Sequence, residues 1–412
     1  MEKIRTEKLL KYLYEDVFDY FILQDCEGEK DRYLKKNKVY TSSVLLRYFL
    51  RSGIVTLNTI ILSLINRNKK KRPAVFFYLD PITYEDLLQG LCKDYTVFIS
   101  NPFKKKANKN TYPILLTSIL NDLIIGYESK DYELIQKAIN TLAKTLSMGK
   151  IDIVVLNDII HPVNRAFVFV CRELGIKTIE IQHAVYPKEM KLIKGLGADY
   201  VFVWGDFFKK MYIEQEIRSK QSIRILGYPF NILDKTLEKK KKLTLYYLAQ
   251  GFHLQNMSNL DIMIDNAVAL KEACQKNNIN FKCRLHPNSP KFYFDKILPK
   301  VQITPMDESL ISAIADGDIF VSFNSTAILQ ASMNDKYCIQ LLNIPVEGDN
   351  LYELGVCDEV FVDVDSLAIH LKKVSRNPSL LTNPRDKKKN NYVMQPIPDA
   401  ETKFRMLLND LC

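Results

Sequence analysis

The sequence predicts a two-domain α/β protein in which each domain holds a parallel, doubly wound sheet. The chain has 412 residues, which is more than one hydrophobic core usually serves. Short apolar runs alternate with helical stretches, most clearly from about residue 150 onward. A charged stretch at 234–242, almost free of apolar residues, separates two such series. We therefore expect the junction between the domains at 234–242.

The first series predicts an N-terminal domain at 1–233. Strands are expected at 74–79, 96–100, 151–156, 177–182, 200–204 and 223–226, and helices near 6–24, 40–66 and 83–92. The most clearly marked helix begins at Pro162, a residue favoured at the first helical position, and ends at Gly175.

The second series predicts a C-terminal domain at 243–395. Strands are expected at 243–249, 281–285, 318–322 and 337–342, with helices at 259–276, 308–315 and 326–333. The final residues, 396–412, have the apolar spacing of a closing helix.

Composition and charge restrict the class of protein. With 47% hydrophobic and 26% charged residues, the chain has the balance of an ordered globular protein. The net charge of +10 comes partly from lysine-rich runs at 69–72, 104–106, 239–242 and 387–389. Solvated loops explain these runs, and peripheral contact with an anionic membrane is the alternative. The runs have no interleaved aromatic residues or zinc-finger spacing, so nucleic acid is not an expected partner.

The cysteines and the N-terminus indicate a cytoplasmic protein. None of the eight cysteines forms a CxxC pair, which is typical of free thiols in a reducing compartment. The N-terminus is charged and has no signal-peptide core. An apolar segment at 53–65, flanked by basic residues, is too short to span a membrane. We expect it to be a buried helix, with attachment to the inner face of the plasma membrane as the alternative.

Polar residues gather at the ends of the strands expected in the second domain. An open parallel sheet binds ligands beyond the carboxyl ends of its strands. The residues at these ends are Gln250, Gly251, Arg284, His286, Ser322, Asn324, Ser325 and Thr326. Ser325 and Thr326 stand where a strand leads into a helix, a position that favours an anion. The set predicts a phosphate site. The alternative for Ser325 and Thr326 is helix capping, the commoner role for such residues taken alone, and the alternative for His286 is a structural role in the turn at Pro287.

Five segments resemble the ordered landmarks of bacterial GT-B glycosyltransferases of surface-polysaccharide synthesis. They are IQHAVYP at 181–187, ADYVFVWGDFF at 198–208, IRILGYPF at 223–230, RLHP at 284–287 and ADGDIFVSFNSTAILQASM at 315–333. The similar groups are the sialyltransferases and polysialyltransferases, the capsule Kdo transferases, and the polyol-phosphate transferases of teichoic acid synthesis. The resemblance implies a GT-B fold, with two facing Rossmann-like domains and a central cleft.

The resemblance also implies roles for individual residues. His286 and the hydroxyls of Ser325 and Thr326 take the position of groups that contact the donor phosphate. His183 takes the position of the histidine in a His-Gly motif, with Ala184 in place of the glycine. We expect His183 to be the catalytic base or a phosphate ligand, with a buried structural role as the alternative. Asp158 ends the adjacent strand and is the second candidate for the base, or a carboxylate that orients it, with helix capping as its alternative role.

These observations predict a nucleotide-sugar-dependent glycosyltransferase that builds a cell-surface glycan. Inversion is expected, because a single displacement needs one base and no protein nucleophile. CMP-sialic acid is one candidate donor. No metal or other cofactor is expected, since Asp363 and Asp365 have no further ligand cluster around them. The alternatives are a CDP-polyol phosphotransferase of the teichoic-acid type, a nucleotide-sugar 2-epimerase and a non-catalytic binding module.

Overall fold

The computed structural model describes most of both domains. The described residues are 62, 72–78, 87–88, 90–100, 111–114, 116–128, 131–157, 162–182, 197–214, 222–229, 242–249, 257–286, 296–297, 299–305, 307–344, 350–382, 393–395 and 400–411. The helices expected near 6–24 and 40–66 lie outside them, except for the buried Leu62. The lysine-rich runs and the charged stretch at 234–242 also lie outside, apart from Arg72 and Lys242.

The first sheet is parallel throughout and has seven strands, in the order β3-β2-β1-β4-β5-β6-β7. The strands are β1 (Ala74–Tyr78), β2 (Thr96–Ile99), β3 (Thr111–Pro113), β4 (Ile153–Leu156), β5 (Lys177–Ile181), β6 (Tyr200–Val203) and β7 (Ile223–Ile225). The sequence predicted all of them except the short edge strand β3. The last one ends at Ile225 and the first strand of the second sheet begins at Thr244.

Helices cover both faces of this sheet. They are α6 (Thr117–Glu128), α7 (Tyr132–Met148), α8 (Pro162–Leu174), α9 (Asp206–Glu214) and the 3-10 helix η1 (Leu91–Lys93). Helix α8 has its predicted bounds, and Gly175 ends it with a φ of +69°, which glycine adopts without strain. Alternate strand residues point to opposite faces, so Phe76 and Val154 pack with α7 and α8 while Phe77 and Val155 pack on the other side.

The second sheet is also parallel and has the order β12-β11-β10-β8-β9. Its strands are β8 (Thr244–Leu248), β9 (Asn280–Arg284), β10 (Ile319–Ser322), β11 (Tyr337–Leu341) and β12 (Glu359–Phe361). The helices of this domain are α10 (Met257–Lys276), α12 (Leu310–Asp316), α13 (Thr326–Met333), α14 (Val364–Arg376) and the 3-10 helix η5 (Pro378–Thr382). Residues of α10 and α14 cover one face of the sheet, and those of α12 and α13 cover the other.

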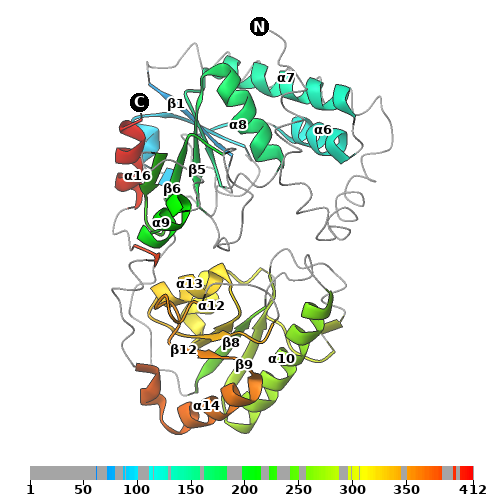
Figure 1. Cartoon of the computed structure of the whole chain (residues 1–412), viewed down its shortest axis with the longest axis vertical. Helices are drawn as coiled ribbons and strands as arrows, with labels where there is room; N and C mark the ends of the chain where they lie inside the picture. The colour runs from blue at the N-terminus through cyan, green and yellow to red at the C-terminus, as the bar shows by residue number, and fades with distance from the viewer. Residues whose placement is uncertain are drawn as a thin grey trace.

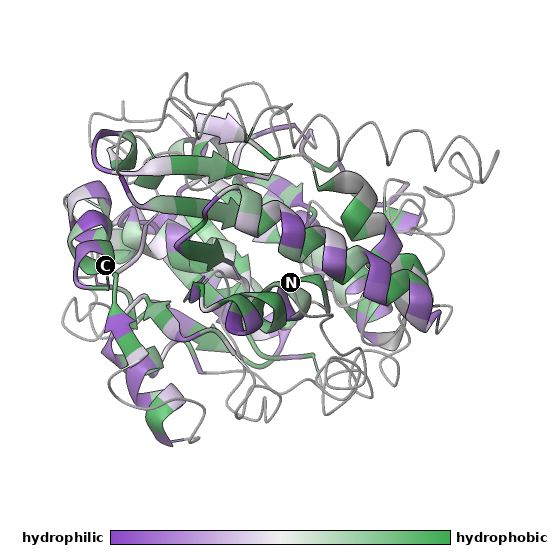
Figure 2. Ribbon diagram, turned by 90° about the horizontal axis from the view of Figure 1, so that it is seen from above, coloured by the Kyte–Doolittle hydropathy of each residue, from purple (hydrophilic) through white to green (hydrophobic). Residues whose placement is uncertain are grey.

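The predicted fold class is therefore confirmed: the chain forms two parallel-sheet α/β domains (Figure 1). In Figure 2 the hydrophobic colour is concentrated on the strands and on the helix sides that cover them. Within the described ranges, no helix is long and apolar enough to cross a membrane.

The last helix, α16 (Ala400–Asn409), returns to the first domain (Figure 1). The ring of Phe404 lies 6.0 Å from that of Phe77 and 5.8 Å from that of Phe202. Phe404 is fully buried in the same cluster as both rings. The predicted closing helix is thus present, and it completes the core of the N-terminal domain although it follows the second domain in sequence.

The strand orders define where each sheet can bind a ligand. In the first sheet the chain winds outward from β1 to β3, returns beside β1 as β4, and continues to β7 on the other side. In the second sheet the corresponding reversal lies between β8 and β10. A doubly wound sheet binds ligands outside the carboxyl ends of its strands at this switch point. The two places to search are therefore the β1/β4 and β8/β10 edges.

Candidate functional site

A hydrogen bond ties the two strands that flank the second switch point. The hydroxyl of Ser322, the last residue of β10, donates to the carbonyl of Leu248, the last residue of β8, over 3.1 Å. Ser322 is fully buried. Its hydroxyl therefore holds the strand ends together beneath the surface, and the predicted contact between Ser322 and a phosphate stays a prediction.

The N-terminus of α13 lies directly after this strand end. Ser325 is the N-cap: its backbone is extended, with φ −100° and ψ 138°, and its side chain accepts a hydrogen bond of 3.2 Å from the Ala327 N–H. Thr326 is the first helical residue. Ser325 therefore has the capping role that was given as its alternative. Other N–H groups of the first turn still have no intrahelical acceptor. These groups and the helix dipole favour an anion at the position predicted for the phosphate.

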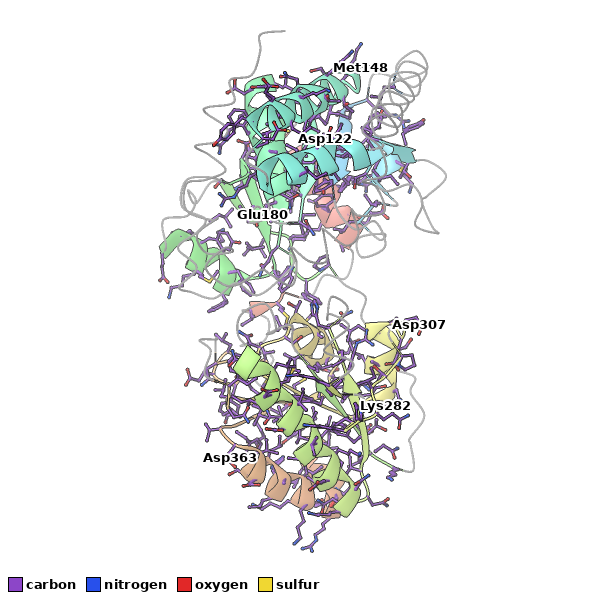
Figure 3. The ribbon with its side chains drawn as sticks, turned by 90° about the vertical axis from the view of Figure 1, so that its right-hand side faces the viewer. Asp122, Met148, Glu180, Lys282, Asp307 and Asp363 are labelled. Atoms are coloured by element: carbon purple, nitrogen blue, oxygen red, sulfur yellow. The ribbon has the colours of Figure 1, made fainter. Side chains whose placement is uncertain are left out.

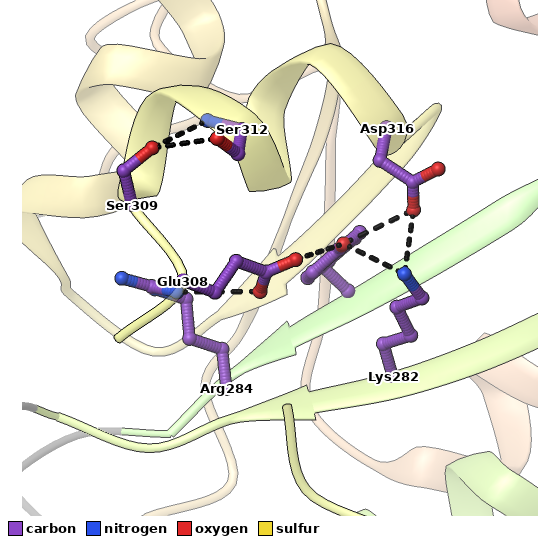
Figure 4. Close-up of polar contacts among 7 residues, drawn as sticks. Lys282, Arg284, Glu308, Ser309, Ser312 and Asp316 are labelled. Carbon is purple, nitrogen blue, oxygen red and sulfur yellow. Dashed lines mark hydrogen bonds and ion pairs between the residues drawn. The ribbon is translucent and has the colours of Figure 1, made fainter. Parts of the chain in front are cut away.

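Arg284, at the end of β9, has a carboxylate partner that sequence reasoning missed. Its guanidinium Nη1 lies 3.4 Å from Oε2 of Glu308, and the two side chains are only 14% and 18% exposed (Figure 4). Glu308 precedes Ser309, the N-cap of α12. It is 24 residues away in sequence, and no local pattern links it to Arg284. A phosphate that binds Arg284, as predicted, would therefore share the guanidinium group with Glu308.

The same ion pair belongs to a longer polar network on the α12 side of the sheet (Figure 4). The Tyr246 hydroxyl lies 3.3 Å from Glu308, 3.0 Å from Asp316 and 3.2 Å from Nζ of Lys282. Lys282 pairs with Asp316 over 2.9 Å. Burial and the two carboxylates raise the pKa of Tyr246, so its phenol stays protonated. The network fixes both ends of α12 to β8 and β9.

Three other predicted residues of this site are less fully placed. His286 is exposed and lies just beyond the end of β9, the strand that pairs with β8. Gln250 and Gly251 lie outside the described residues, but Ala249 before them is buried at the end of β8. The ends of β8, β9 and β10 thus lie at the same edge of the second sheet, with β8 between the other two.

In the first domain the two candidate bases, Asp158 and His183, lie outside the described residues. Their neighbours in sequence are placed at adjacent strand ends. Asn157 follows β4, and Gln182 follows β5. Oε1 of the buried Gln182 accepts a hydrogen bond of 3.0 Å from the backbone N–H of Trp204. This bond fixes the end of β5 against β6, directly before His183.

Two fully buried charged side chains lie close to this edge. Glu180, on β5, is buried on the face that packs against α8, and Arg165, on α8, is 1% exposed. Both have interaction partners, so neither charge is isolated. Figure 3 shows Glu180 on the part of the N-terminal domain nearer to the C-terminal domain, with Met148 on the far part. The sequence alone does not single out Glu180 as a site residue, because a glutamate within an apolar run carries no motif.

The described part of the chain contains no group of three or more potential metal ligands. Asp363, one of the aspartates considered for a metal, is the N-cap of α14 and accepts hydrogen bonds from the backbone N–H and hydroxyl of Ser366. These bonds lower its pKa. The six cysteines within the described residues are free thiols. Burial raises the pKa of Cys283 to about 12, so this thiol is no nucleophile at neutral pH.

No protein-family model and no curated protein matches the sequence. Solved structures do. The UDP-GlcNAc 2-epimerase of Methanocaldococcus jannaschii is 14% identical, with a TM-score of 0.54 over 82% of this chain and 99% of the other. S. aureus MnaA, solved with UDP, is 12% identical, with a TM-score of 0.52 over 83% and 96%. A variant of the wall teichoic acid polymerase TagF is 12% identical, with a TM-score of 0.51 over 89% and 96%.

These similarities establish the fold of the chain. Two parallel doubly wound sheets, with a C-terminal helix returning to the first, form the GT-B arrangement that the sequence landmarks implied. Identities of 11–14% carry the comparison no further than the fold. The activity has to be argued from the residues at the two sheet edges.

Proposed function

We propose that this protein binds a nucleotide sugar at the carboxyl edge of its second sheet and transfers the sugar to a hydroxyl group of a glycan. The observation that carries the proposal is the position of the Ser325-capped helix α13 at the β8/β10 switch point. A helix N-terminus at such a point suits a phosphate group. Structures of the same fold support the proposal, since MnaA was solved with UDP and the protein HepE with UDP-glucose.

In the proposed reaction, an oxygen of the acceptor attacks the anomeric carbon of the sugar. The bond from that carbon to the phosphate oxygen breaks, and its electron pair leaves with the nucleotide. The hydroxyl proton passes to His183 or Asp158. The N-terminus of α13 and His286 donate hydrogen bonds to the departing phosphate, which stabilises the charge that develops there. One displacement gives inversion, and no metal is part of the proposal.

Sugar epimerisation is a second candidate. It is favoured by the UDP-GlcNAc 2-epimerases among the structures of the same fold and by the buried carboxylate of Glu180 in the first domain. Transfer of a polyol phosphate is a third, and the similarity to TagF, a wall teichoic acid polymerase, supports it.

For glycosyl transfer, CMP-sialic acid is one donor to test. We place the reaction at the cytoplasmic face of the membrane, where the net charge of +10 suits anionic lipids.

A thermal-shift titration with CMP, CDP, UDP and GDP tests the binding step. A ligand that binds only the folded protein raises the midpoint of unfolding. We expect one nucleotide to raise it, and His286→Ala to reduce that rise. His370→Ala, on the distant helix α14, is the control and should leave the rise unchanged. No rise with any nucleotide would contradict the proposal.

The product distinguishes the three reactions. The protein is incubated with a nucleotide sugar, with and without a glycan acceptor, and followed by NMR. Glycosyl transfer releases the nucleotide only when the acceptor is present. Epimerisation changes the sugar while it remains attached to the nucleotide and needs no acceptor. A CDP-polyol phosphotransferase instead turns over CDP-glycerol with release of CMP, and binding without turnover identifies a non-catalytic module.

A further inference from the structure

Three asparagine side chains have a buried amide oxygen that accepts no hydrogen bond. They are Asn164, Asn259 and Asn324, and within the described chain no other polar contact of these side chains is present. Buried polar groups in folded proteins are nearly always hydrogen-bonded, because a dry, unpaired amide costs free energy. Unpaired buried groups that persist in a folded protein are expected at functional sites, where ligand binding and not stability retains them.

The positions of the three asparagines share a feature. Asn164 is the third residue of α8, which follows β4, and Asn259 is the third residue of α10, which follows β8. Asn324 follows β10 and precedes the N-cap of α13. The strands β4, β8 and β10 are three of the four strands beside the two switch points. All three unpaired amides therefore lie at the edges where this fold binds ligands.

The contacts of Ile262 and Asn266, on the same helix, indicate which part of the second domain the Asn259 side of α10 faces. Ile262, one helical turn further along α10, packs against the cluster formed by Phe323 and Ile344. Asn266, two turns along, exchanges two hydrogen bonds of 2.9 and 2.6 Å with Asn343, just beyond β11. This flank of α10 thus faces the ends of β10 and β11. Asn259 lies on the same flank at the carboxyl edge, and Asn324 follows Phe323 in the chain.

The chemistry of an amide oxygen restricts its ligand. It accepts hydrogen bonds and so repels phosphate oxygens, which are acceptors too. The N–H groups at the start of α13 are the donors that suit a phosphate. Hydroxyl groups suit the amides. The buried side chains of Phe323 and Ile344 next to them form a small apolar cluster, which suits the carbon face of a sugar ring.

We propose that Asn259 and Asn324 form a neutral subsite that accepts hydrogen bonds from hydroxyl groups of a nucleotide sugar, beside the phosphate position at α13. The proposal rests on the function proposed above. The hydroxyls belong either to the ribose or to the transferred sugar, and the ligand series below separates these two sources.

The first arm of the test measures the stability of the protein without ligand. Asn259 and Asn266 are on the same helix and are 3% and 4% exposed, but only Asn266 is hydrogen-bonded. Replacement of an unpaired buried amide by an apolar group of similar size removes a cost. We expect Asn259→Leu to keep or raise the midpoint of thermal unfolding and Asn266→Leu to lower it. An equal loss in both variants would show that water or another group pairs with Asn259, and would overturn the proposal.

The second arm measures affinity with pyrophosphate, UDP, UDP-GlcNAc, CMP and CMP-sialic acid. We expect Asn259→Leu and Asn324→Leu each to weaken nucleotide-sugar binding by about tenfold, which corresponds to about 1.4 kcal/mol. Pyrophosphate binding should be unchanged. An equal loss for the nucleotide and its sugar conjugate assigns the hydroxyls to the ribose, and a loss for the conjugate alone assigns them to the sugar.

The outcomes separate this inference from the proposed function. If the wild-type protein binds a nucleotide sugar and both leucine variants bind it equally well, the subsite is wrong and the proposed function stands. If the wild-type protein binds none of the nucleotides CMP, CDP, UDP and GDP, the proposed function fails, and the subsite fails with it.

Discussion

The hydroxyl of Ser322 donates a hydrogen bond of 3.1 Å to the backbone carbonyl of Leu248. The bond joins the carboxyl ends of β10 and β8, the two strands between which the winding of the second sheet reverses. The residues that follow these ends lead into α13 and α10. One buried contact therefore holds together the two strand ends at the edge where the candidate phosphate site lies.

Ser322→Ala is expected to destabilise the protein and to weaken nucleotide binding. The substitution leaves the Leu248 carbonyl buried without this donor, which costs about 1–3 kcal/mol. Ser332→Ala is the matched control: its hydroxyl donates 2.7 Å to the Val356 carbonyl, also in a buried setting but toward the other end of α13. Urea unfolding should show similar losses for the two variants, whereas only Ser322→Ala should change the affinity for the nucleotide. Equal affinities would mean that the bond does not shape the site.

Substitutions at Ser325 can separate two effects at the N-terminus of α13, the capping of the helix and the repulsion of a bound phosphate. Aspartate is as good an N-cap as serine, so Ser325→Asp should retain the stability of the helix. Its carboxylate would stand where the phosphate is predicted, and repulsion between the two anions should reduce nucleotide affinity by at least tenfold. Ser325→Ala should instead lower stability by about 1 kcal/mol. Tight nucleotide binding by the aspartate variant would show that the phosphate does not bind at α13.

The Arg284–Glu308 pair yields a prediction in which stability and affinity change in opposite directions. Glu308→Gln removes the carboxylate that lies 3.4 Å from the guanidinium. The folded state should lose about 1–3 kcal/mol, because a charge-assisted hydrogen bond is lost. Arg284 then offers its full charge to a phosphate, so UDP or CDP should bind several-fold more tightly at low salt, as measured by calorimetry.

Asp316→Asn, at the other end of the same network, is the control for this prediction. It weakens the 2.9 Å pair with Lys282 and should lower stability without a gain in nucleotide affinity. If both variants only destabilise the protein, Arg284 serves the attachment of α12 and not the ligand.

Much of the fold could be predicted because local patterns determine it. Apolar runs mark the central strands, and Pro162 and Gly175 mark the bounds of α8. The short strand β3 escaped prediction, since its three residues, Thr111 to Pro113, carry too little apolar pattern and are held by pairing with β2. The location of α16 in the first domain is a tertiary property that no local pattern contains.

The candidate site could be predicted only in part. Sequence order places Ser325 at a strand-to-helix turn, which was enough to expect a cap and an anion position. It does not show that the Ser322 hydroxyl turns inward to β8 or that Glu308 reaches Arg284. Nor does it show that Asn259 lacks a partner while Asn266, seven residues later, has one. These properties depend on which side chains meet across elements distant in sequence.

His370 is expected to make stability depend on pH. Its ring nitrogen Nε2 lies 3.1 Å from the Tyr337 hydroxyl, and the two rings are stacked. Burial lowers the pKa of His370 below its ordinary value of 6.5; Glu359 opposes this effect and Lys373 adds to it. The unfolded chain therefore binds the proton first as the pH falls. The contribution of uncharged His370 to the stability of the folded state is fully present above pH 6.5 and is lost as the pH falls through the lower pKa of the folded state.

His370→Gln should remove this contribution. Glutamine does not titrate, and its amide can still bond to the Tyr337 hydroxyl. The free energy of unfolding is measured by urea denaturation from about pH 8 to pH 5, the range in which histidine changes charge. Carboxylates titrate alike in both proteins, so the difference between the two curves isolates His370. We expect wild type to lose more stability than the variant below pH 6.5. Parallel curves over the whole range would show that His370 has the same pKa in the folded and unfolded chain.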